Sequence, residues 1–294
     1  MKLVKSVLSA SILAAAVSTA TAAEFEAYGS VQPMYNPEGG STYDGISDAN
    51  SHFGYKINTE LGNGLTISVK HEIGIDQEFK NLEFSDTEAR HAFIEISGDF
   101  GTASVGRNYG PAYNSVGYVA DMFYWNTTGS KIATTRLSET LFYAAPSFNG
   151  LSVEVAFDTT DNNHNEIGIT YKVNDNLSLS ASNVSSDTAT EENSGIAAKY
   201  SRDDFTVMVS REEADNATTT NVKEASNLYI SYTLNDSTSI AGHIADQKTA
   251  AGVETNPAVV GLYHSLMDGL SVWAEYSDYD NGTEMPTIGL DYRF

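Results

Sequence analysis

The residues of this chain that could do chemistry are not spaced to build a catalytic or metal centre. The sequence contains no G-x-S-x-G motif of a serine nucleophile. Its histidines are scattered and lack the spacing of metal ligands. They are His52, His71, His91, His164, His243 and His264. The sequence therefore predicts no catalytic residue, no metal site and no cofactor, and the protein is not expected to be an enzyme.

One acidic segment, residues 161–166, begins like a calcium-binding loop. It reads D-N-N-H-N-E, with acid or amide side chains at alternate positions. An EF-hand loop requires glycine where Glu166 stands and a closing glutamate where Lys172 stands. We therefore reject an EF-hand, and a weak, loop-held divalent ion is the alternative that remains.

The charge of the chain is strongly acidic. It contains 39 Asp and Glu residues against 16 Lys and Arg, and two of the basic residues lie within the first 22 positions. Without those positions the formal net charge is −25. This charge excludes nucleic acid as a partner and predicts attraction for cations that salt screens. There is no cysteine, so no disulfide stabilises the fold.

The first residues have the pattern of an export signal. Lys2 and Lys5 precede an apolar stretch over residues 7–17, and Ala-Thr-Ala follows at residues 20–22. A basic start, a short apolar run and an A-x-A site predict a signal peptide over residues 1–22 that is cleaved after export. The apolar run is too short to span a bilayer as a helix.

From residue 23 to residue 294 the chain alternates between strand-like segments and breaks that are short and long in turn. The short breaks are rich in Asn, Asp and Gly, as tight turns are. They lie at residues 62–64, 98–101, 147–150, 174–176, 202–204, 235–237 and 267–269. Eight longer breaks lie near 36–50, 76–86, 108–130, 159–164, 185–193, 212–224, 246–256 and 279–283. Seven turns and eight loops predict an all-β fold, a closed 16-stranded antiparallel transmembrane β-barrel with short periplasmic turns and long outer loops.

Alternation within the segments predicts which side chains face the lumen. Over residues 65–73 the apolar set should face lipid and the polar set the lumen. The lumen set is Thr66, Ser68, Lys70 and Glu72. In residues 136–145, Leu137, Leu141 and Tyr143 are expected to point outward and Arg136, Ser138 and Thr140 inward. A polar interior within sixteen strands is wide enough for water.

The last residues read as a strand with Leu290, Tyr292 and Phe294 on one face. A barrel must pair its last strand with its first to leave no open edge in lipid. We therefore expect residues 24–34 to pair with residues 284–294. The ending with Tyr292 and Phe294 also resembles the C-terminal signal that the barrel-assembly machinery of outer membranes recognises.

Two internal stretches resemble a known family. Residues 92–110, with GDFGT followed by GRNYG, and residues 136–151, with Y-A-A-P-S-F-N-G-L, are similar to the trimeric general-diffusion porins of Gram-negative outer membranes. The likeness in strand and turn order covers essentially the whole mature chain. It implies a homotrimer in the cell outer membrane, in contact with lipid and lipopolysaccharide, that passes ions and small hydrophilic solutes by passive diffusion.

The resemblance also implies a pore constriction. In the family the third loop folds into the barrel, and its carboxylates face basic side chains on the opposite wall. Asp121 matches one loop carboxylate, whereas aromatic residues, including Tyr124 and Trp125, replace an acidic run of the family. The basic wall would comprise His52, Lys56, Arg90 and Arg136, with Lys70 added by strand alternation. His52 stands where the family usually has Arg and Ser30 where it often has Lys, so we expect a preference for cations.

The resemblance further suggests that Glu78, Glu83 and Arg107 lie at the subunit interface, where they are candidates for an ion pair. Two other functions remain open at this stage. One is a solute-specific channel for oligosaccharides, in which Tyr124 and Trp125 stack on sugar rings rather than bracing the loop. The other is an outer-membrane enzyme or adhesin, which the absence of a catalytic site and the modest loop lengths disfavour.

Overall fold

The computed structural model describes residues 22–37, 45–76, 83–84, 89–127, 131–160, 163–187, 192–215, 217, 221–280 and 283–294. The signal peptide expected over residues 1–22 lies outside the described residues, apart from its last residue. Glu78 also lies outside them.

The described chain is a succession of β-strands with two short helical turns. In the first half these elements are β1 (Glu24–Val31), β2 (Pro33–Asn36), β3 (Gly45–Asp48), β4 (His52–Gly62), β5 (Leu65–Asp76), β6 (Glu83–Phe84), β7 (His91–Gly98), β8 (Gly101–Tyr109), α2 (Pro111–Ser115), the 3-10 helix η1 (Gly117–Ala120), β9 (Arg136–Ala144) and β10 (Leu151–Asp158). In the second half they are β11 (Asn165–Lys172), β12 (Leu177–Ser185), β13 (Asn193–Arg202), β14 (Phe205–Ala214), β15 (Val222–Asn235), β16 (Thr238–Thr249), β17 (Glu254–Thr255), β18 (Ala258–Met267), β19 (Leu270–Asp278) and β20 (Glu284–Arg293). Neither helical turn of the described chain has the length or apolarity needed to cross a bilayer.

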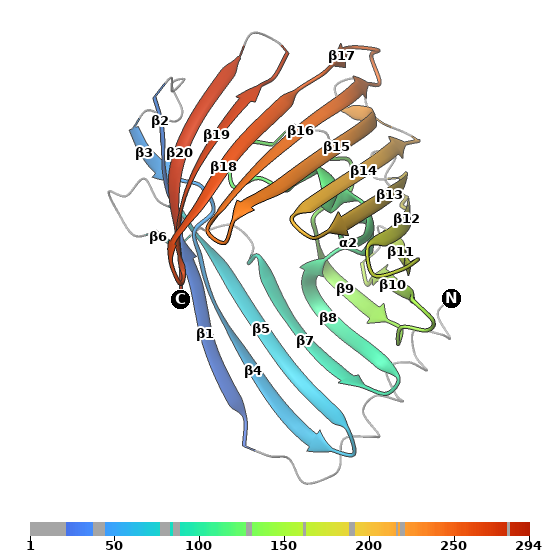
Figure 1. Ribbon diagram of the computed structural model, residues 1–294. Helices are drawn as coiled ribbons and strands as arrows, with labels where there is room; N and C mark the ends of the chain where they lie inside the picture. The colour runs from blue at the N-terminus through green and yellow to red at the C-terminus, as the bar shows by residue number, and fades with distance from the viewer. Residues whose placement is uncertain are drawn as a thin grey trace.

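The strands form one closed antiparallel barrel (Figure 1). β1 and β2 together make its first strand, and β3 and β4 make its second. β6 and β17 are short strands that pair within the outer loops. Each of the other strands crosses the barrel wall once, which gives the 16 strands that the sequence predicts.

The seven predicted tight turns all connect neighbouring strands. The turn between β4 and β5 shows why such turns can be recognised from the amino-acid sequence. Asn63 and Gly64 both have a positive φ, 53° and 75°, as the type I′ hairpin requires. Asn and Gly tolerate this left-handed conformation best. Such turns join each strand to the next with minimal chain, so the register of each hairpin is fixed locally.

The barrel closes between its first and last strands, as predicted. Ser30 pairs with Arg293 and Met34 pairs with Gly289. At the end of the chain Gly29 and Phe294 exchange two backbone hydrogen bonds, of 3.0 and 3.2 Å. These contacts join residues 29–35 to residues 288–294 and close the seam there, whereas residues 24–28 of β1, which were also expected to pair with the last strand, are paired with β4.

Strand alternation gives the predicted faces on β5 and β7, but part of β9 departs from them, as Leu137 and the contact of Ser138 with the outward Arg107 show. On β5, Ser68 and Glu72 are buried on the lumen side, and on β7 Ile94 is 47% exposed on the outside. Leu137 was expected to face lipid, and this expectation is wrong. It is 7% exposed and packs with Phe142, which lines a cavity on the lumen side.

A β-bulge explains the exception. Gly106 of β8 pairs with Thr140 of β9, and Asn108 pairs with Leu137. Between these two pairs β9 advances three positions, whereas β8 advances two. Glu139, within the bulge, has a φ of 53°. An extra residue shifts the alternation by one position, so Leu137 turns inward although Leu141 keeps its predicted face.

The interior is occupied by the loop between β8 and β9, residues 110–135, called here the third loop. Its helix α2 starts at Pro111, a residue whose fixed φ suits the first helical position. Val116, Val119 and Phe123 of the loop then pack on the inner wall against Met208 and Tyr229. This apolar contact holds the loop inside the barrel, where Figure 1 shows α2 beside β11 and β12.

Candidate functional site

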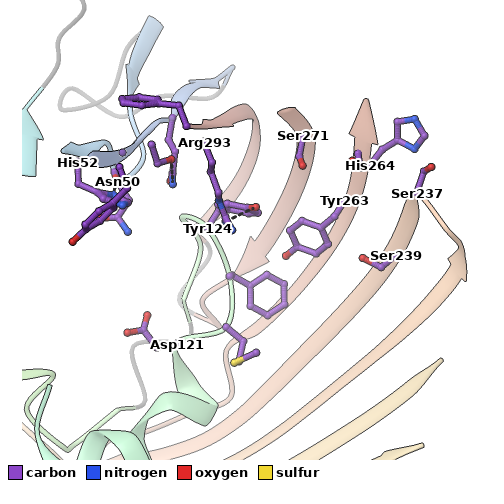
Figure 2. A pocket seen from close by; sticks show the side chains of 18 of the residues that line it. Asn50, His52, Asp121, Tyr124, Ser237, Ser239, Tyr263, His264, Ser271 and Arg293 are labelled. Carbon is purple, nitrogen blue, oxygen red and sulfur yellow. Dashed lines mark hydrogen bonds between the residues drawn. The ribbon is translucent and has the colours of Figure 1, made fainter. Parts of the chain in front are cut away.

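The third loop and the barrel wall enclose a cavity of about 940 Å³. Figure 2 shows Asp121 and Tyr124 extending from the loop, with Asn50 and His52 on one wall. The other wall carries hydroxyl groups, among them those of Ser237, Ser239, Tyr263 and Ser271.

Asp121 lies on the inner side of the loop and lines the cavity. Its Oδ2 accepts hydrogen bonds from Tyr113 Oη at 3.1 Å and from Lys131 Nζ at 3.2 Å. The side chain of Asp121 remains 30% exposed. Burial, together with the charge of Asp121, raises the pKa of Tyr113, so its hydroxyl stays a donor to this carboxylate. The partner Lys131 had not been assigned a role from the sequence.

Lys70 and Arg90 lie together on the wall of the same cavity, around a carboxylate. Arg90 Nε donates to Glu72 Oε1 at 2.7 Å, and Lys70 Nζ is 3.5 Å from Glu72 Oε2. The hydroxyl of Tyr28 donates to Glu72 Oε2 at 2.9 Å. The basic wall is thus an ion-paired cluster rather than a row of free cations.

The other members of the predicted basic wall are more dispersed. His52 lines the cavity and its Nδ1 lies 2.9 Å from the backbone oxygen of Asn50. Lys56 faces a second cavity instead, which it shares with acidic residues of the neighbouring strands. Arg136 stacks over the ring of Tyr109 at 4.7 Å and donates to its hydroxyl at 3.0 Å. The cavity therefore brings together His52, Lys70 and Arg90, whereas Lys56 and Arg136 do not line it.

Tyr124 braces the loop against the wall. Its ring stacks on Trp273 with centroids 5.3 Å apart and an interplanar angle of 7°. Its hydroxyl donates to Asp291 Oδ2 at 3.0 Å and accepts from Arg293 Nη2 at 3.2 Å. Burial and the neighbouring Asp291 raise the pKa of Tyr124 to about 12, so the hydroxyl remains a donor. A ring stacked in this way presents little face to a sugar.

The tip of the loop is fixed by one buried carboxylate, Glu275 of β19. It is 3% exposed and accepts three consecutive backbone N–H groups. Tyr124 donates at 2.7 Å, Trp125 at 3.1 Å and Asn126 at 2.8 Å. Tyr263 Oη donates a fourth bond, at 3.1 Å. Hydrogen bonds to an ionised acceptor are the strong ones in proteins, so Glu275 clamps the loop tip to the wall.

Two further wall carboxylates bind the backbone of the loop elsewhere. Glu212 Oε2 accepts the N–H of Ala133 at 2.8 Å. Glu166 Oε2 accepts the N–H of Ala112 at 3.0 Å, in the first turn of α2, where a negative charge also suits the helix dipole. These three glutamates were missed from the sequence as functional residues. Their lumen-facing alternation was the available signal, but alternation does not reveal which loop amides they meet.

Of the remaining predicted residues, Phe294 lines the cavity, and the others lie away from it or have side chains outside the description. Arg107 is on the outward-facing alternation of β8, and its guanidinium donates to Ser138 Oγ. Glu83 belongs to β6, and its side chain is outside the description. Tyr292 and Phe294 lie side by side at the end of β20, with ring centroids 6.1 Å apart.

A comparison with protein-family models identifies the family to which this barrel belongs. The model of the Gram-negative porins matches residues 9–284. The chain belongs to the Gram-negative porin family. This porin is accordingly an outer-membrane channel for passive diffusion, and its family membership points to a non-enzymatic channel.

Solved structures share the fold of the porin. OmpF of Salmonella typhi, in complex with daunomycin, aligns with a TM-score of 0.72 and 16% identity, over 92% of this chain and 97% of that chain. A mutant porin of Rh. blastica aligns with a TM-score of 0.73 and 19% identity, over 93% and 100%. The anion-selective porin of Comamonas acidovorans aligns with a TM-score of 0.70 and 14% identity, over 93% and 100%. A search of curated protein sequences finds no match.

Proposed function

We propose that this porin is a non-specific diffusion pore for ions and small hydrophilic solutes, and that it prefers cations. The fold alone does not decide the sign of the preference, since an anion-selective porin shares it. The side chains that line the lumen must decide it.

The observation that supports cation preference is the balance of charge on the described lumen wall. Three cavities along the barrel are lined by seven carboxylates and four cations, a net of three negative charges. The carboxylates are Glu24, Glu60, Glu72, Glu95, Asp121, Glu154 and Asp236, and the cations are Lys56, Lys70, Arg90 and Arg293. A lumen of one sign concentrates ions of the opposite sign.

Asp121 is the exposed carboxylate of the third loop, and its removal tests the proposal. A unit charge acts on an ion about 6 Å away in water with about 0.7 kcal/mol. Asp121→Asn should therefore disfavour K⁺ and favour Cl⁻ by about threefold each, and so lower the K⁺ to Cl⁻ permeability ratio by about tenfold. The reversal potential across a planar bilayer with asymmetric KCl measures this ratio. Arg90→Ser combined with Arg136→Ser should move it in the opposite direction.

The ion pair of Asp175 and Lys172 provides a matched control. It lies in an exposed turn outside the lumen, with 2.9 Å between the charged atoms. Asp175→Asn removes the same charge and should leave the reversal potential unchanged. The wild-type preference should also decline between 0.1 M and 1 M salt, as the Debye length falls from about 10 Å to about 3 Å. A wild-type preference for anions would refute the proposed selectivity.

We also propose that the porin assembles as a homotrimer, as its family generally does. The outward position of Arg107 supports a contact between subunits. Extraction in mild detergent should give a heat-sensitive species of about three chains, which boiling converts to the monomer. Monomer alone under several extraction conditions would count against the trimer.

A further inference from the structure

Glu72 occupies an unusual place for a carboxylate, because it stands inside the basic wall of the pore. Arg90 Nε and the Lys70 ammonium approach it at 2.7 and 3.5 Å, and the hydroxyl of Tyr28 donates to it. Only 6% of the Glu72 side chain is exposed, compared with 20% for Arg90 and 27% for Lys70. The cations therefore face the lumen while their counter-ion lies behind them.

This arrangement changes the charge that a passing ion meets. A row of uncompensated cations would repel K⁺ and attract Cl⁻ at the narrow part of the pore. With Glu72 ionised, the cluster of Lys70, Arg90 and Glu72 carries one net positive charge in place of two. The third cation of this cavity, Arg293, is likewise paired, with Asp291 at 2.7 Å. Each lysine and arginine that lines the described cavity thus has a carboxylate within 3.5 Å.

We infer that Glu72 is a specificity-determining residue of the pore, which compensates the basic wall and so lets cations pass the neck. The inference rests on the cation preference proposed above. It assigns to Glu72 a role that its hydrogen bonds alone would not require. A neutral acceptor at this position could keep much of the geometry with Tyr28 and Arg90. It could not compensate the positive charges of Arg90 and Lys70.

The first experiment separates charge from geometry by conservative replacement. Glu72→Gln preserves the size and an acceptor oxygen but removes the charge, and we expect the K⁺ to Cl⁻ permeability ratio to fall at least threefold. Glu72→Asp retains the charge and should keep the ratio close to that of the wild type. Tyr28→Phe removes one hydrogen bond without changing charge and should also leave the ratio nearly unchanged. Asp175→Asn again controls for loss of a paired carboxylate outside the lumen.

A double variant tests compensation directly and guards against misfolding. Glu72→Gln combined with Arg90→Gln removes one charge of each sign, and it should restore the ratio most of the way to the wild-type value. Each variant is first checked for folding by the heat-dependent shift of its electrophoretic mobility. Should Glu72→Gln disturb folding, the comparison of Arg90→Gln with the double variant still reports the effect of the Glu72 charge.

The outcomes distinguish this inference from the proposed function. An anion-preferring wild type would overturn the proposed cation preference itself. If the wild type prefers cations but Glu72→Gln leaves the ratio unchanged, Glu72 is only a structural anchor. The same conclusion would follow if Tyr28→Phe reduced the ratio as strongly as Glu72→Gln, or if the double variant behaved like Glu72→Gln alone.

Discussion

Glu275→Gln is expected to turn a steady open-channel current into one that switches between several conductance levels. The glutamine can still accept hydrogen bonds through its amide oxygen, but its NH₂ group would face a backbone N–H of the third loop. Each bond lost to the charged acceptor costs about 1.5–3 kcal/mol. A loss of about 3 kcal/mol favours the released loop tip by more than a hundredfold relative to the wild type.

Single-channel recording at fixed voltage measures this effect as the frequency and size of current steps. Glu154→Gln is a useful control. Glu154 also lines the lumen beside the loop, but it accepts from the side chain of Asn114, at 2.9 Å, rather than from the loop backbone. It should alter selectivity without adding current steps. Quiet, wild-type-like current from Glu275→Gln would show that the apolar contacts of Val116, Val119 and Phe123 suffice to hold the loop.

Deletion of Phe294 should lower the amount of porin in the outer membrane by several-fold. The deletion removes the aromatic end that resembles the assembly signal and both backbone hydrogen bonds with Gly29. A net backbone hydrogen bond contributes about 1 kcal/mol, and losses of 1–2 kcal/mol change protein abundance several-fold in cells. The channels that do assemble should conduct normally, because Phe294 takes no part in the ion-paired clusters of the neck.

Immunoblots of outer-membrane fractions measure the level, and bilayer recordings test the surviving channels. Phe148→Ala serves as the control, since Phe148 is also an exposed aromatic, at 72%, but lies in the turn before β10. Phe294→Tyr keeps an aromatic terminus and should assemble well. Normal levels after deletion of Phe294 would remove it from the proposed assembly signal.

The architecture could be predicted from the sequence because barrel rules act locally. Each tight turn can be recognised from a few turn-forming residues, such as Asn63 and Gly64. Along each strand, apolar and polar side chains then alternate until the next turn. The failure at Leu137 has a physical cause. A bulge inserts one residue without any change in amino-acid composition that would mark it. The residues on one side of the bulge, here Leu137, then face the opposite way from what simple alternation predicts.

The site was harder to predict because its decisive contacts join segments far apart in the chain. A family likeness for Asp121 and strand alternation for Lys70 indicated that both side chains face the lumen, and both line the cavity. Lys131, which pairs with Asp121, lies ten residues further on within the same loop, and no periodicity relates the two. Glu275 meets the loop tip across about 150 positions of sequence, and only the folded chain shows that its carboxylate reaches those amides.

Asp291 has a consequence for the order in which this molecule is made. Its carboxylate accepts from Ser30 on the first strand and from Tyr124 in the third loop, and the Ser30 contact joins residues 261 positions apart. Contacts of such high sequence separation form late, since the entropy of closing the intervening chain must be overcome first. The hydrogen bond from Tyr124 to Asp291 can form only when the last strand is in place, in addition to the contacts that Glu275 makes with the loop tip. A chain truncated before β20 would therefore lack both the closing seam of the barrel and this contact between the third loop and the wall, so the last strand completes the two together.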